Sequence, residues 1–122
     1  MTRPNSPAVS FEISGDLSIL PAAVEVAAYR IAQEAISNAT KHAGAKHITV
    51  RMTRADNGLT LEIDDDGIGV AADTNRSGVG LASMTERATE LGGWCINKHS
   101  PTSGMLVKAW LPILVIGSAG NG

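Results

Sequence analysis

The sequence contains QEAISNATKHA at residues 33–43, DDDGIG at 64–69 and SGVGL at 77–81, in that order. The first segment is rich in alanine and predicts a helix that carries Glu34 and Asn38. The second predicts an acidic residue set against a glycine turn, and the third a glycine turn that opens another helix. This order is more informative than any one of the segments alone.

Together the segments supply the groups that a nucleoside triphosphate with its cation requires. Glu34 and Asn38 offer a carboxylate and an amide for a hydrated Mg²⁺. One acid of the aspartate run would accept a hydrogen bond from an adenine amino group, and bare backbone amides at the glycine turns suit phosphates. The sequence therefore predicts an ATP site.

Length and composition indicate one globular unit, because 122 residues with 43% hydrophobic content fill one ordinary core. Ten basic and twelve acidic residues leave a net charge of -2, which gives no basic footprint for nucleic acid. Cys95 is the single cysteine, so an intramolecular disulfide is excluded and a reducing compartment fits. We expect a buried, inert thiol.

The ends of the chain lack structural signals. We assign residues 1–10 to a linker or cut end, 11–113 to the folded domain and 114–122 to a flexible tail. No apolar stretch suits a secretory signal or approaches the roughly 20 residues that span a bilayer. We expect no membrane contact by this fragment.

The alternation of apolar and polar residues predicts strands separated by two helices. The expected elements are a short strand near 11–13, a helix from about 21 to 42–44, strands 47–54 and 59–65 joined by Asp56-Asn57-Gly58, a helix over 81–91, and strands 94–99 and 105–111 joined by a Pro-Thr-Ser-Gly turn. Hairpins rather than strict βαβ alternation predict an α+β fold. We expect a two-layer α/β sandwich, with helices on one face of a mixed, mostly antiparallel sheet.

The first long helix separates an apolar stripe from a polar cluster. At roughly 100° per residue, one sector should face the sheet. Glu34, Asn38 and Lys41 fall just to one side of this sector, at the rim of the core. His42 falls within the sector, which favours a capping or packing role over ligand contact. The apolar sector contains Val24, Ala28, Ile31, Ala35 and Ala39.

The segment at 64–69 has other readings. A calcium loop needs acids at alternate positions and a glutamate at the twelfth, whereas these acids are consecutive and Asn75 stands there. A dinucleotide fingerprint must open an apolar helix, but a polar loop follows, and no GxxxxGK[ST] motif occurs. A merely acidic turn after a strand stays open as the plain alternative. Gly78-Val79-Gly80, in contrast, directly precedes a helix whose N-terminus favours anions, and we expect Met84 of that helix in the core.

Four segments carry a family resemblance: QEAISNATKHAGA, DDDGIG, SGVGLASMTERATELGG and SGMLVKAWLP. As an ordered set they resemble the ATP-binding catalytic domain of two-component sensor histidine kinases, over about residues 11–112. The match is closest to the subfamily with a very short ATP lid that is paired with LuxR-type response regulators. The wider GHKL superfamily shares the Bergerat fold and includes DNA gyrase and MutL ATPases.

The resemblance assigns roles to individual positions. Asn38 matches the Mg²⁺ ligand, and Glu34 its acidic partner and the candidate catalytic base. Asp65 matches the acid that accepts a hydrogen bond from the adenine amino group, Asp66 is then a variable residue, and Arg87 a structural one. The other implied ATP-binding residues are Lys41, Gly67, Ile68, Gly69, Gly78, Val79, Gly80, Leu81 and Met105.

The chain departs from the family at Gly104-Met105, where the family commonly has Gly-Thr. A threonine hydroxyl would help to hold adenine and its water, whereas methionine offers only packing. We therefore expect altered affinity or purine selectivity. The loop between Gly69 and Gly78 is also short, so we expect an open site that retains nucleotide weakly.

The resemblance implies a module that binds ATP and Mg²⁺ and donates the γ-phosphate to a histidine on an upstream dimerisation domain. His42, His47 and His99 do not match such a phosphoacceptor, so this fragment should bind nucleotide without autophosphorylating. We expect a monomeric fragment of a homodimeric protein that is either cytoplasmic or a membrane-bound sensor with this domain in its cytoplasmic part. The expected partner is a response regulator. The alternatives are a water-directed ATPase with Glu34 as base, and a non-catalytic nucleotide-binding scaffold.

Overall fold

The computed structural model describes residues 6–42, 44–67, 80–100 and 104–113. These residues form five strands and two helices. In chain order they are β1 (Ala8–Ser14), α1 (Ala22–His42), β2 (His47–Ala55), β3 (Gly58–Asp65), α2 (Leu81–Glu90), β4 (Trp94–His99) and β5 (Met105–Pro112). β1 begins at residue 8, earlier than the expected domain start at residue 11, because its Ala8 N–H donates to the Lys46 carbonyl at 2.9 Å.

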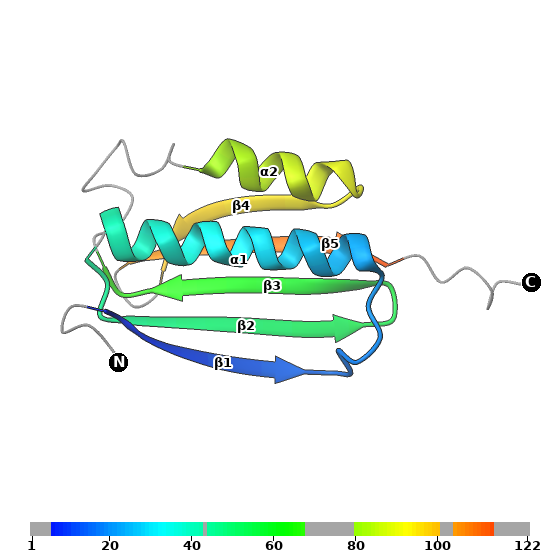
Figure 1. The fold of residues 1–122 in the computed structure, drawn as a ribbon, viewed down its shortest axis with the longest axis horizontal. Helices are drawn as coiled ribbons and strands as arrows, with labels where there is room; N and C mark the ends of the chain where they lie inside the picture. The colour runs from blue at the N-terminus through cyan, green and yellow to red at the C-terminus, as the bar shows by residue number, and fades with distance from the viewer. Residues whose placement is uncertain (1–5, 43, 68–79, 101–103, 114–122) are drawn as a thin grey trace, which may run out of the picture.

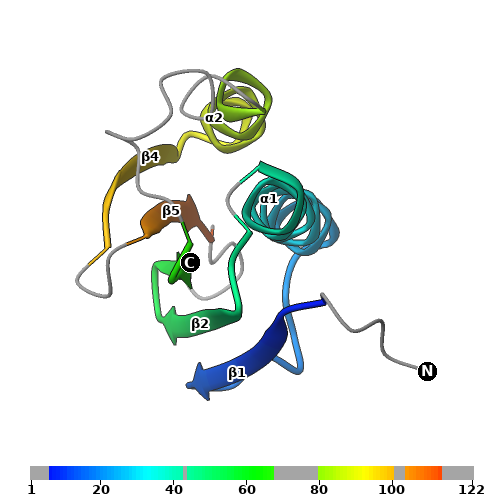
Figure 2. The same ribbon diagram turned by 90° about the vertical axis from the view of Figure 1, so that its left-hand side faces the viewer.

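The described strands form one sheet in the order β1-β2-β3-β5-β4. β1 runs parallel to β2, and the other neighbouring strands are antiparallel. Both helices lie on the same face of this sheet, as the two views in Figures 1 and 2 show. The two-layer arrangement confirms the predicted α+β fold class.

Helix α1 covers the centre of the sheet with the apolar stripe that the sequence predicts. Pro21 precedes the helix, and its carbonyl accepts the first-turn hydrogen bond from the Glu25 N–H at 3.0 Å. Small alanines in the stripe let the helix approach the strands closely. The stripe residues Val24, Ala28, Ile31, Ala35 and Ala39 are all buried.

The turn between β2 and β3 differs by one position from the expected Asp56-Asn57-Gly58 connection. Gly58 is already a strand residue, paired with Ala55, so only Asp56 and Asn57 form the turn. A Cβ atom on Gly58 would lie 2.4 Å from the indole nitrogen of Trp110. Glycine is required here because an aromatic ring from β5 lies on its Cα.

The core lies between the sheet and the two helices. Its fully buried side chains come mainly from the central strands: Ile48 and Val50 of β2, Leu59, Leu61 and Ile63 of β3, Leu111 of β5, with Ile31 of α1. Met84 is buried in this core, as expected. Cys95 is buried too, and its burial raises the pKa of the thiol to about 11, which keeps it protonated and inert.

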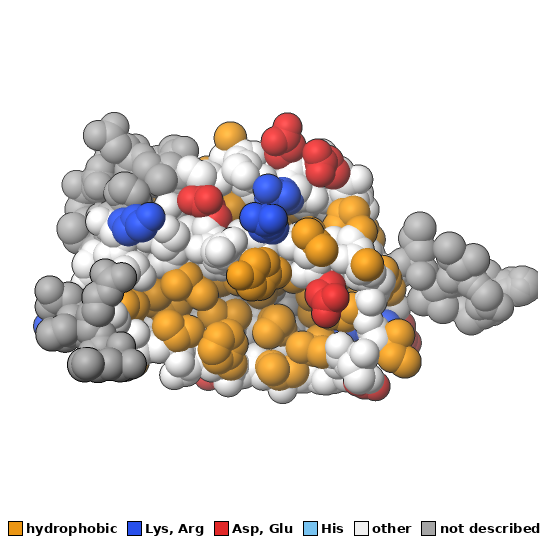
Figure 3. Space-filling model, viewed as in Figure 1, with side chains coloured by type: hydrophobic (Ala, Val, Ile, Leu, Met, Phe, Trp, Pro, Cys, Tyr) orange, Lys and Arg blue, Asp and Glu red, His pale blue; other side chains and the backbone are white. Residues whose placement is uncertain are grey.

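Strand β1 lies at the edge of the sheet, beyond the cover of α1. Val9, Phe11 and Ile13 point to the helix side but stay exposed, as do Val26 and Tyr29 on α1. Figure 3 shows the apolar side chains gathered along this face, below α1. Among the described residues, neither helix is long and apolar enough to cross a membrane.

Candidate functional site

Four chain segments meet at one end of the sandwich. The C-terminal end of α1, the end of β3, the start of α2 and the start of β5 all lie at the left of Figure 1, and Figure 2 looks onto this end. The sheet topology produces the arrangement, because β3 ends where its antiparallel neighbour β5 begins. Residues far apart in the sequence are thereby brought close together.

Glu34 and Gly80 connect the first and third sequence segments directly. A Cβ atom built on Gly80 would lie 2.3 Å from Oε2 of Glu34, so the carboxylate lies over the Gly80 Cα. Gly80 is the N-cap of α2 with φ 71°, a left-handed conformation that favours glycine. The Glu34 carboxylate thus lies at the positive end of the α2 dipole.

Asn38 and Lys41 differ in exposure. Asn38 lies one turn after Glu34 on α1 and is only 5% exposed, whereas Lys41 is exposed and Glu34 intermediate. Of the three residues predicted at the rim of the core, Glu34 alone has the expected intermediate exposure. The side chain of His42 is outside the described residues, so its expected packing role stays a prediction.

Asp65 is the last residue of β3 and faces the helix side of the sheet. Its side chain is buried at 4% exposure. Oδ1 accepts hydrogen bonds from the Gly67 N–H at 2.9 Å and the Met105 N–H at 3.3 Å. Burying a carboxylate is costly without such donors. Two backbone donors, one from each side of the acid, therefore fix its orientation.

Gly104 is a site residue that the sequence interpretation did not assign. A Cβ atom there would lie 2.0 Å from the Asp65 carbonyl oxygen and 2.2 Å from Asp65 Oδ1. No side chain fits at that distance, so only glycine lets the connection into β5 reach Asp65. The sequence signal for this role is the glycine of the Gly104-Met105 pair.

Asp66 has a structural role that its interpretation as a variable residue missed. Its Oδ1 accepts the N–H groups of Lys46 and His47 at 2.8 and 2.9 Å, and its Oδ2 lies 2.8 Å from His47 Nδ1. The hydrogen bonds from His47 and Lys46 lower the pKa of Asp66 to about 2. Asp66 thus ties the residues after Asp65 to the start of β2.

Comparison with known proteins identifies the family of the chain. A sequence model of the family described as "Histidine kinase-, DNA gyrase B-, and HSP90-like ATPase" matches residues 23–115. The chain belongs to this family. The resemblance found in the sequence is confirmed.

Curated relatives of this ATPase domain are sensor kinases. The chain is 33% identical over 106 residues to the signal transduction histidine-protein kinase/phosphatase DegS of Brevibacillus brevis, covering 86% of this chain and 28% of that protein. It is 37% identical over 97 residues to the kinase/phosphatase UhpB of Salmonella typhimurium, covering 80% and 19%. The chain therefore spans less than a third of either relative.

Solved structures agree with the ATPase fold. The ATP-binding domain of PrrB from Mycobacterium tuberculosis superposes with a TM-score of 0.68 at 30% identity, covering 89% of this chain and 82% of that one. A histidine kinase domain from Erythrobacter litoralis superposes with a TM-score of 0.71 at 18% identity, covering 88% and 52%, which supports the fold alone.

Several predicted ATPase residues lie outside the described part of the chain: Ile68, Gly69, Gly78 and Val79. Leu81 is described, begins α2 and packs partly buried against the core. Met105 is 5% exposed, and the Asn97 amide nitrogen lies 3.8 Å from its sulfur. Its backbone N–H, rather than its side chain, contacts Asp65.

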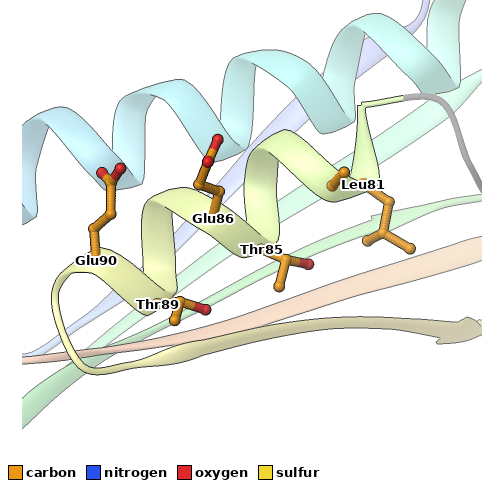
Figure 4. A pocket seen from close by; sticks show the side chains of 6 residues that line it. Leu81, Thr85, Glu86, Thr89 and Glu90 are labelled. Atoms are coloured by element: carbon orange, nitrogen blue, oxygen red, sulfur yellow. The ribbon is translucent and has the colours of Figure 1, made fainter.

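A hollow on α2 shares only Leu81 with the predicted ATP-binding residues. Figure 4 shows its side chains, which project from α2 alone: Leu81, Ala82, Thr85, Glu86, Thr89 and Glu90. Among the described residues no three His, Cys, Asp or Glu side chains group as a metal cage. Mg²⁺ bound mainly through water and phosphates needs none.

Proposed function

We propose that the protein containing this chain is a sensor histidine kinase, in which this domain binds ATP and presents the γ-phosphate to a histidine of another domain. The observation that carries the proposal is the contact of Glu34 with Gly80, which joins α1 to the start of α2. The end of β3, which carries the backbone-held Asp65, lies at the same end of the sandwich (Figure 1).

Each group has a defined task in this proposal. Asp65 accepts a hydrogen bond from the adenine amino group, since its carboxylate is oriented by two backbone donors. The N-terminus of α2 at Gly80 and Leu81 receives phosphate oxygens. Gly67 and Met105 line the base end, and exposed Lys41 reaches the phosphates from α1.

Glu34 and Asn38 fit Mg²⁺ as the cation of the nucleotide. They are hard oxygen donors one helical turn apart, and Mg²⁺ prefers one or two such ligands together with water and phosphates. The bound cation would neutralise charge on the triphosphate. Phosphoryl transfer then depends chiefly on positioning and charge stabilisation, which these residues supply.

In this proposal the phosphoacceptor is a histidine of another domain. In the described residues His47 and His99 are strand residues, and His47 is bonded to Asp66. The proposed acceptor is a histidine on an upstream dimerisation domain. We propose a homodimer for the whole protein and a monomer for this fragment. A response regulator then receives the phosphoryl group in the cytoplasm, where ATP is available.

A phosphotransfer assay tests the proposal. The domain alone, incubated with labelled ATP and Mg²⁺, should bind nucleotide but neither label itself nor release inorganic phosphate at an appreciable rate. Adding the histidine-bearing domain of the same protein should give an acid-labile phosphoprotein. Steady ATP hydrolysis by the isolated domain, abolished in Glu34→Gln, would instead identify a water-directed ATPase. A folded domain that does not bind ATP at millimolar concentration would be a scaffold.

A further inference from the structure

Asp64 and Asp65 are neighbours on β3 whose side chains point to opposite faces of the sheet. Asp65 faces the helices, whereas Asp64 faces the open side, and both are buried, at 4% and 7% exposure. A buried carboxylate on the open face needs its own donors. Asp64 finds them in Ser100 and Arg51.

The Ser100 hydroxyl donates to Oδ1 of Asp64, and Arg51 Nη1 lies 3.5 Å from Oδ2. Ser100 is itself buried at 8% exposure and directly follows β4. Arg51 is shared with Glu12 and Glu62, at 3.2 and 3.8 Å, so it is not dedicated to Asp64. The contact between Ser100 and Asp64 therefore links the end of β4 to the end of β3.

Ser100 also contacts Gly104, the residue that precedes β5. The Ser100 N–H donates to the carbonyl of Gly104 at 3.0 Å, which fixes Gly104 relative to the end of β4. Gly104 lies against Asp65, and the next residue, Met105, donates its N–H to Asp65 Oδ1. A chain of contacts thus runs from Asp64 on one face, through Ser100 and Gly104, to Asp65 on the other.

We propose that Ser100, held by Asp64, is a positioning residue that sets the Asp65 carboxylate for recognition of the exocyclic amino group of adenine. The inference rests on the proposed function, because it takes Asp65 as the base acceptor. Ser100 acts through the Gly104-Met105 backbone: its hydroxyl is held by Asp64, and its N–H in turn holds the Gly104 carbonyl. Loss of the hydroxyl releases Ser100 from Asp64, so that Ser100 and the Gly104 carbonyl bonded to it can shift together and the Asp65 carboxylate can rotate away from the base.

The test compares ATP with purine riboside triphosphate, which lacks the 6-amino group, as ligands of the 122-residue chain in calorimetry. The wild-type chain should bind ATP about tenfold more tightly than the analogue, as expected for a hydrogen bond to a charged acceptor. In Ser100→Ala this preference should fall to about threefold or less. Ser100→Thr keeps the hydroxyl and should show the wild-type preference for ATP.

Ser10→Ala is the matched control, because it removes a hydroxyl from an exposed position on β1. It should keep the wild-type preference. If Ser100→Ala does not fold, the double variant with Asp64→Asn replaces it, since a neutral amide costs less than a carboxylate when it loses a donor. The double variant should show the same reduced preference.

The outcomes test the role of Asp65 as the base acceptor separately from the positioning role of Ser100. Equal binding of ATP and the analogue by the wild-type chain would overturn the role of Asp65 itself. A wild-type preference that persists in Ser100→Ala, or in the double variant, would overturn only the positioning role. A merely structural role of Ser100 would weaken both ligands by the same factor and leave the preference unchanged, which also counts against the inference.

Discussion

The carboxylate of Glu34 on α1 lies over the Cα of Gly80, the residue that begins α2. This contact joins two segments that are separated in the chain by the strands β2 and β3. It also explains why the sequence segment Gly78-Val79-Gly80 must end in glycine. Any side chain on Gly80 would occupy the place of the carboxylate.

Gly80→Ala should therefore lower ATP affinity in addition to lowering the stability of the fold. The new Cβ would displace the flexible Glu34 side chain, and φ 71° adds strain of about 1 to 2 kcal/mol. Gly44→Ala is the matched control, since Gly44 has φ 60° and an added Cβ atom there would meet nothing within 4 Å. Urea unfolding should show similar losses in both variants, whereas ATP affinity should fall about tenfold in Gly80→Ala alone. Equal affinities would contradict the role of this contact.

Asp65→Asn should weaken ATP binding with little change in fold. The amide keeps an oxygen that accepts from the Gly67 and Met105 N–H groups, but it loses the charge. A hydrogen bond to a charged group is worth about 1.5 to 3 kcal/mol, or about 10- to 100-fold in affinity. Titration calorimetry at constant Mg²⁺ measures it, and an unchanged dissociation constant would remove Asp65 from the site.

Asn38→Ala should affect nucleotide binding only when the cation is present. If Asn38 is a ligand of Mg²⁺, ATP affinity should fall about tenfold in magnesium buffer and stay unchanged in EDTA. Gln33→Ala, at an exposed position on the same helix, serves as the control for helix effects. A loss of the same size with and without Mg²⁺ would argue against the ligand role.

The bonds of Asp66 predict a stability change at acid pH. Its pKa is about 2 in the folded chain and 3.8 in the ordinary case, so the folded state binds the proton more weakly. The resulting stability is complete above about pH 4 and is lost as the pH falls from about 4 to 2. Urea midpoints over this window should fall more steeply in the wild type than in Asp66→Asn. Asp56→Asn, at the β2–β3 turn, should keep the wild-type steepness.

Met105→Thr should cost stability and sharpen base recognition. Methionine at 5% exposure fills the core beside Asp65, so its truncation costs about 2 kcal/mol. The hydroxyl would add a polar group near the base, and the ratio of ATP to GTP affinity should rise. Met105→Leu keeps the volume without a hydroxyl. Identical ratios in the two variants would show that this departure from the family has no effect on selectivity.

Local patterns predicted much of the fold. The stripe from Val24 to Ala39 repeats at helical spacing, and its burial follows from that spacing. The strands near Trp94 and Met105 likewise lie where alternation and turn residues place them. Such features depend on neighbours in sequence, and so the sequence alone contains them.

Contacts between distant segments could not be predicted in this way. Gly58 was interpreted as a turn residue because nothing nearby indicates that Trp110 lies on it. Asp66 was interpreted as variable because its partners Lys46 and His47 precede it by about twenty residues. The role of Gly104 could not be predicted without knowing that Gly104 lies against Asp65. Each of these depends on the pairing of strands, which fixes register only after the whole sheet has formed.

The β3–β5 pairing is the line along which the sheet joins two separate hairpins, β2–β3 and β4–β5. The contact between Asp65 and Met105 crosses this line, because Asp65 belongs to one hairpin and Met105 to the other. Local opening along this line would separate Asp65 from the Met105 N–H while both hairpins stayed intact. We therefore expect bound nucleotide to stabilise the β3–β5 pairing. Addition of nucleotide should slow amide hydrogen exchange more in β3 and β5 than in β1.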